Sequence, residues 1–208
     1  MASTTDIANM ALARIGSNRI NDLDTDANVQ AVQCRLCYEA DRDALLRMFW
    51  WPFAAARAIL VASVTAPAFE YDYAYALPSD FLALRSIWDE SEEGGITPVM
   101  AELEGAYVLS SETPLSIRYT KKVIDPGLFD PLFVRTLATQ MALDMLYPLA
   151  GNASVGAGQA IKNELEVLMI RSKMMHLAEQ NLIGRTARRT WLDARLSNGG
   201  LNLARLGS

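Results

Sequence analysis

The stretch of residues 22–53 constrains the fold of this chain more than any other. It begins with an acidic turn and closes with the sequence Met48-Phe49-Trp50-Trp51-Pro52-Phe53. Asp24 or Thr25 can cap a helix at its start, and Pro52 cannot lie inside one. We therefore predict a long helix that runs to about Phe49. Its apolar positions, which alternate with a charged face, are Val29, Val32, Leu36, Cys37, Leu45 and Met48.

The aromatic residues Trp50, Trp51 and Phe53 stand at the end of this helix, where the pattern turns to strands. They could form a platform for a ligand. Aromatic side chains at a helix-to-strand corner more often hold two layers of a domain together. We predict that these three residues, called the aromatic corner below, join a helical layer to a β-rich part.

Three further helices are indicated by periodicity and by end signals. Ser3 and Asp6 have capping-box spacing, which predicts a helix over residues 4–15 that ends at Gly16. Asp130 followed by Pro131 predicts the start of an apolar helix that runs to about residue 147. A fourth helix is predicted over about residues 157–182, ended by Gly184, with a wide buried stripe.

Residues 53–123 show the period of two that is typical of strands. Strands are predicted at 69–77, 84–88 and 115–122, and a hairpin turning at Glu104-Gly105 joins 99–103 to 106–109. Short strands close together in sequence favour an antiparallel sheet. The predicted fold is therefore α+β: a four-helix bundle with two N-terminal and two C-terminal helices, an inserted antiparallel sheet or partial barrel, and an extended C-terminal arm. The bundle comprises residues 1–52 and 125–184, the β-rich insertion 53–124 and the arm 185–208.

Charge and hydropathy narrow the possible partners. The net charge of −5 argues against a general nucleic-acid binder. No apolar run is long enough to span a bilayer, and the N-terminus lacks a secretion signal, so we expect no membrane association and folding in a cytosol. Residues 185–208 carry five arginines against one aspartate, a composition typical of a solvated or partner-bound end.

The motifs that could support catalysis or metal binding are incomplete. The aspartates at 22, 24 and 26 imitate a calcium loop, but Ala27 and Gln33 stand where glycine and glutamate are required. Cys34 and Cys37 have no second ligand pair, and the single histidine is distant in sequence. We expect no cofactor, no metal and no enzyme activity, although hydrolysis of a cell-wall glycan by paired carboxylates stays an alternative.

The order of several short motifs resembles the tail tubular protein A family, the head-to-tail adaptors of short-tailed bacteriophages. The motifs are Ala11 with Arg14-Ile15-Gly16, Leu23-Asp24-Thr25-Asp26-Ala27-Asn28, Trp50-x-x-Phe53, Tyr75-Ala76-Leu77-Pro78-Ser79-Asp80-Phe81-Leu82 and Trp191-Leu192-Asp193-Ala194-Arg195. They cover nearly the whole chain. Ser17-Asn18 departs from the pattern, because relatives often carry a proline after the glycine.

The resemblance implies a structural virion protein in the neck of the particle, assembled in the host cytoplasm. It implies a ring, usually of twelve copies, between the portal protein and a downstream tail or nozzle protein. Genomic DNA would pass through its channel without specific binding. A neck connector of a long-tailed phage or gene-transfer particle, and a cellular helical interaction module, are the other readings without catalysis.

The C-terminal segment is the predicted portal-binding element. Its composition of one aromatic anchor among arginines is typical of a segment that becomes ordered on binding. Trp191 and Leu192 would fill a pocket of the portal, while the arginines would pair with acidic portal residues. The residues of this hypothesis are Arg185, Arg188, Arg189, Trp191, Leu192, Asp193 and Arg195.

Overall fold

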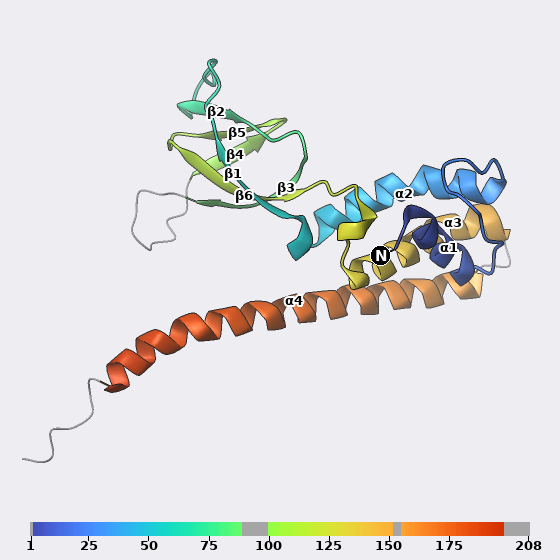
Figure 1. Cartoon of the computed structure of the whole chain (residues 1–208). Helices are drawn as coiled ribbons and strands as arrows, with labels where there is room; N and C mark the ends of the chain where they lie inside the picture. The colour runs from blue at the N-terminus through green and yellow to red at the C-terminus, as the bar shows by residue number, and fades with distance from the viewer. Residues whose placement is uncertain (1, 89–99, 152–154, 198–208) are drawn as a thin grey trace, which may run out of the picture. The chain divides into compact units, whose positions relative to one another are not determined.

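The computed structural model describes residues 2–88, 100–151 and 155–197, with the side chains of the last helix only as far as residue 179. The chain divides at Leu168 into two compact units, Met1–Leu168 and Met169–Ser208. The four α-helices are α1 (Thr4–Arg14), α2 (Val29–Met48), α3 (Pro131–Ala150) and α4 (Val155–Ser197) (Figure 1). The strands are β1 (Ala55–Leu60), β2 (Tyr73–Ala76), β3 (Phe81–Trp88), β4 (Ala101–Glu104), β5 (Tyr107–Ser110) and β6 (Leu115–Lys121). The predicted α+β class is confirmed.

Local hydrogen bonds set the starts of the helices. The capping box of Ser3 and Asp6 is present at α1, and Asp130 caps α3 by accepting from the Leu132 amide at 2.7 Å. The predicted cap of α2 by Asp24 or Thr25 is wrong, because the Asn28 side chain accepts from the Ala31 amide instead. The preceding residues form their own turn, in which Oδ1 of Asp22 accepts from the amides of residues 24 and 25. These bonds hold the chain out of helical geometry until residue 28.

Two helix ends lie beyond their predicted positions. Helix α3 continues past Pro148 to Ala150, because a proline in the last turn removes only one intrahelical donor. Helix α4 continues through Gly184 to Ser197, so the predicted end at that glycine is wrong. A glycine inside a helix costs only about 1 kcal/mol, which good helix formers on either side offset. Residues 185–197 are therefore helical rather than extended, and 198–208 lie outside the described residues.

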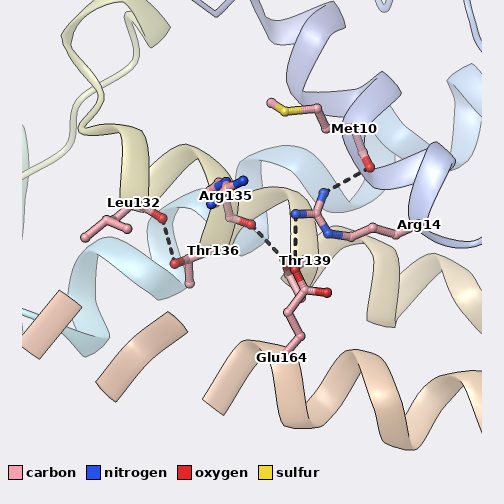
Figure 2. A network of polar contacts seen from close by, with 7 residues as sticks. All are labelled: Met10, Arg14, Leu132, Arg135, Thr136, Thr139 and Glu164. Atoms are coloured by element: carbon pink, nitrogen blue, oxygen red, sulfur yellow. Dashed lines mark hydrogen bonds and ion pairs between the residues drawn. The ribbon is translucent and has the colours of Figure 1, made fainter. Parts of the chain in front are cut away.

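Helices α1 and α2 both pack on α3. Their shared core has no solvent exposure at Ile7 and Leu12 of α1, Leu46 of α2, or Phe133 and Leu137 of α3. Up to Leu168, α4 buries Ile161 and Leu168, and its Glu164 pairs with Arg14 of α1 at 3.4 Å (Figure 2). The complete four-helix bundle stays a prediction.

The β-rich region consists of two antiparallel three-stranded sheets, ordered β1-β6-β3 and β2-β5-β4. They share a core, whose buried members are Leu60, Tyr75, Val108, Leu115, Ile117 and Tyr119. The predicted hairpin at Glu104-Gly105 is confirmed, and Gly105 has the positive φ of 56° that this turn requires. The predicted strand 69–77 shortens to β2, because Glu70 has a left-handed φ of 74°. The acidic loop at 89–95 lies outside the described residues.

Candidate assembly surfaces

The aromatic corner joins the end of α2 to the start of α3. Trp51 is 2% exposed and donates from Nε1 to the Leu45 carbonyl at 3.0 Å. Its ring meets the ring of Phe133 edge-on, with centroids 5.0 Å apart. The ring centroid of Phe53 lies 5.2 Å from that of Phe133. Trp50 is half-buried. These ring contacts lie within the helical layer, so attachment of the sheet by these three residues stays a prediction.

A polar cluster around Arg85 attaches the first sheet to the helices. The guanidinium of this β3 residue donates to the carbonyl of Phe49 at 2.9 Å and to those of Leu46 and Arg47 at 3.3 Å. It also donates to Oγ1 of Thr120 on β6 at 2.6 Å. A cation at the end of a helix satisfies its last carbonyls and complements its dipole. This attachment was missed at the sequence level, because nothing in a strand arginine indicates which distant carbonyls it meets.

Helix α2 exposes an apolar stripe over its first two turns. Val29 is 63% exposed, Val32 39% and Leu36 70%. Their spacing of three and four residues places them on one face, and this set is called the α2 stripe. Ala31 and Cys34 are buried over these two turns, and Leu45 is buried near the end of the helix. Of the apolar positions that the sequence indicates in this helix, Val29, Val32, Leu36 and Met48 are therefore exposed, whereas Leu45 faces the core.

The part of α4 after Leu168 belongs to the second unit and is the secondary-structure element that the structure describes in that unit. It exposes Ile170, Met174 and Leu177, spaced by four and three residues, and this set is called the α4 stripe. The prediction that the stripe of this helix is buried is therefore wrong at Ile170 and Met174. Arg171 and Lys173, both exposed, flank the α4 stripe. An exposed apolar stripe on a helix is the pattern expected of a surface that a partner covers.

The residues predicted to bind the portal lie further along α4. At helical spacing Arg185, Arg188, Arg189 and Leu192 share one face of its backbone. Trp191, Asp193 and Arg195 lie in the same helix, and the side chains of all seven residues are outside the described part of the chain. Their docking stays a prediction.

An open groove of about 910 Å³ lies on the outer face of the β2-β5-β4 sheet. Glu102 and Glu104 of β4 line it beside their cross-strand neighbours Leu109 and Tyr107. The loop before β2 forms its wall and contributes further lining residues, which include Phe69, Glu70 and Tyr71. The burial of Tyr71 and the charges of Glu70 and Glu102 raise the pKa of its hydroxyl. Carboxylates and aromatic rings together repel a phosphate and attract a cationic side chain.

A pair of carboxyl groups lies between α2 and α3. Asp41 is 6% exposed, and its Oδ2 atom is buried with no hydrogen-bond partner among the described residues. Burial, with the neighbouring Asp144 as a second cause, raises the pKa of Asp41 to about 8. Neither residue lines the groove. The pair therefore gives no support to a glycan hydrolase, which needs its two carboxylates around a bound sugar.

The described residues contain no group of three or more histidine, cysteine, aspartate or glutamate side chains that could hold a metal ion. The turn that imitates a calcium loop is held by its own hydrogen bonds, in which Asp22 and Asp26 accept from backbone amides of the same turn. Among the described helices, none has the length and apolar character to cross a bilayer. Comparison with protein-family models and with curated proteins finds no match for this chain.

Proposed function

We propose that this protein is a structural subunit of a phage head-to-tail adaptor. Copies of it form a ring between the portal and the tail, around the channel through which the genome passes. The order of motifs from Ala11 to Arg195 that resembles the tail tubular protein A family supports this proposal. So does the α+β architecture, in which a β-rich region is inserted between α2 and α3.

The observation that carries the proposal is the presence of two separate apolar stripes on the helices. The α2 stripe and the α4 stripe both face solvent in a single chain, although the interior between α1, α2 and α3 is well packed. Contiguous exposed apolar surface is costly in water and is typical of interfaces. A subunit with two different faces of this kind is suited to an assembly in which every copy has two neighbours.

The C-terminal part of α4 supplies the proposed contact with the portal. Arg185, Arg188 and Arg189 on one helical face can pair with carboxylates, and Trp191 is the one large anchor of the segment. Aromatic and arginine residues dominate the energetics of many interfaces. The helix would dock as a preformed element, which lowers the ordering cost relative to an extended arm.

The test is assembly of the purified chain with portal rings of the same phage, observed by electron microscopy and native mass measurement. The full chain is expected to form rings of about twelve copies on the portal, a number that the family resemblance implies and that heterologous closure permits. A variant that ends at Gly184 should lose only the helical circular dichroism of residues 185–197, keep that of the remaining helices, and lose portal binding. Binding of that truncated chain would contradict the docking of residues 185–195, and a full chain that stays monomeric beside the portal would contradict the adaptor function.

A charge variant separates loss of docking from loss of the helix end. Arg188→Glu with Arg189→Glu keeps the length of α4 and reverses two charges of the proposed face. Reduced portal binding by this variant, with unchanged helix content, would show that the arginines themselves make the contact. The neck connector of a long-tailed phage would give the same rings, and the tail component that binds their free face distinguishes the two.

A further inference from the structure

We infer that the α2 stripe of one copy is covered by the α4 stripe of the next copy. This contact rests on the proposed ring and names the surfaces that build it. Each stripe presents apolar side chains at spacings of three and four residues, the pattern of a seam between two packed helices. Leu36 and Met174, 70% and 68% exposed, are the most exposed large side chains of the two.

Charge distribution favours this pairing over pairing of like stripes. Arg171 and Lys173 flank the α4 stripe, and both are exposed. An acidic turn with exposed carboxylates at Asp22 and Asp24 precedes the α2 stripe. Hydrogen bonds from the amides of Thr25 and residue 24 hold the pKa of Asp22 below its ordinary value, so this turn keeps its negative charge. Opposite charges beside the two stripes attract each other across the contact.

The number of apolar faces also favours a contact between unlike surfaces. Pairing of α4 with α4 would cover one stripe of each chain and leave every α2 stripe in water. A head-to-tail contact covers both stripes of every copy once the assembly closes. Contacts between unlike surfaces produce rings when the rotation closes. Covering the two apolar faces by one head-to-tail contact is therefore compatible with the proposed ring.

Cysteine cross-linking between two singly substituted full-length chains tests the contact. Leu36→Cys and Met174→Cys are both surface substitutions, so neither disturbs the core. The two proteins are mixed at high concentration, with and without portal rings, and treated at neutral pH with a short bismaleimide. Cys34 is buried, and burial raises the pKa of Cys34 to about 11 and that of Cys37 to about 12. The native thiols therefore react slowly, and the unsubstituted chain measures their background.

The mixture is expected to give a covalent dimer of the two variants in about tenfold or greater excess over either variant alone. The matched control is Glu179→Cys, which is exposed on the opposite side of α4 from the stripe because it lies nine residues after Ile170. This control should not cross-link to Leu36→Cys above background. Adding Ile170→Glu to the Met174→Cys chain should reduce the mixed product about tenfold, because a charge replaces an apolar contact.

Each alternative has its own outcome. A strong product from Met174→Cys alone would indicate pairing of α4 with α4 and overturn the inference. Rings on the portal without a mixed product would also overturn it, while the adaptor function stands. A mixed product from chains that form no rings would support the contact and contradict the proposed function.

Discussion

Replacing Arg85 by methionine tests whether one polar cluster attaches the first sheet to the helices. The methionine retains the aliphatic stem and removes the guanidinium. Four hydrogen bonds are lost with it, to the carbonyls of Leu46, Arg47 and Phe49 and to Oγ1 of Thr120. All four partners belong to α2, its end, or β6, so the substitution acts where the two layers meet.

The expected loss of stability follows from the geometry. The bonds to Thr120 at 2.6 Å and Phe49 at 2.9 Å are short, and a hydrogen bond to a charged group contributes about 1.5–3 kcal/mol. The two bonds at 3.3 Å are weaker, and half-buried carbonyls recover water when the arginine is removed. Burial also lowers the pKa of Arg85, which shows that the charged form loses some solvation in the fold. The balance of these effects predicts a loss of about 3 kcal/mol in the free energy of unfolding.

Urea unfolding followed by tryptophan fluorescence and by far-ultraviolet circular dichroism provides the assay. Fluorescence includes the signal of Trp88, which lies in β3, whereas circular dichroism mainly follows the helices. For Arg85→Met we expect a lower midpoint and transitions that no longer coincide, because the sheet can unfold before the helices. Arg57→Met, at an exposed position on β1, is the control and should stay within about 0.5 kcal/mol of the original chain. An Arg85→Met chain as stable as this control would refute the attachment.

Two further perturbations test the helical layer. Trp51→Ala should lower the free energy of unfolding in urea by about 3–5 kcal/mol, because it removes a buried ring and the hydrogen bond to the Leu45 carbonyl. A smaller loss than that of Trp50→Ala, at a half-buried position, would contradict this expectation. The pKa of Asp41 is raised to about 8 in the fold from about 3.8 in the unfolded chain, so the folded chain holds the proton more tightly. The stability that the protonated carboxyl contributes is therefore complete below about pH 4 and is lost as the pH rises to about 8. Asp41→Asn should therefore gain about 3–4 kcal/mol relative to the original chain between about pH 5 and pH 8. Equal pH dependence of the two unfolding free energies would show that Asp41 is ionised throughout.

The features predicted correctly from sequence have local causes. The capping box of Ser3 and Asp6, the Asp130 cap and the turn at Glu104-Gly105 each depend on residues within a few positions of one another. The misplaced start of α2 has a local cause too, since three aspartates and Asn28 compete for the same role. Asn28 prevails because Asp22 already accepts two amides of its own turn. Composition alone does not rank such competitors.

The candidate assembly surfaces could not be predicted, because helix α2 carries apolar residues on more than one face. Its buried face includes Asp41 and Arg42, whereas Val29 and Leu36 are exposed. A sequence pattern identifies an apolar stripe without indicating whether the same chain or another chain covers it. The contacts of Arg85 were equally hidden, because they join residues far apart in sequence. Which apolar stripe faces the core is decided only when α3 packs on the other side of the helix.

The two ends of α2 have different surroundings. Its first two turns carry the α2 stripe, and its last turn is held by Trp51 on one side and Arg85 on the other. A helix of 20 residues is about 30 Å long and stiff. In the proposed ring, a neighbouring copy that packs on Val29 and Leu36 would fix the orientation of α2, and the Arg85 cluster would pass that orientation to the attached sheet. Loss of Arg85 would leave the contact between copies intact while freeing the sheet from the register of the ring.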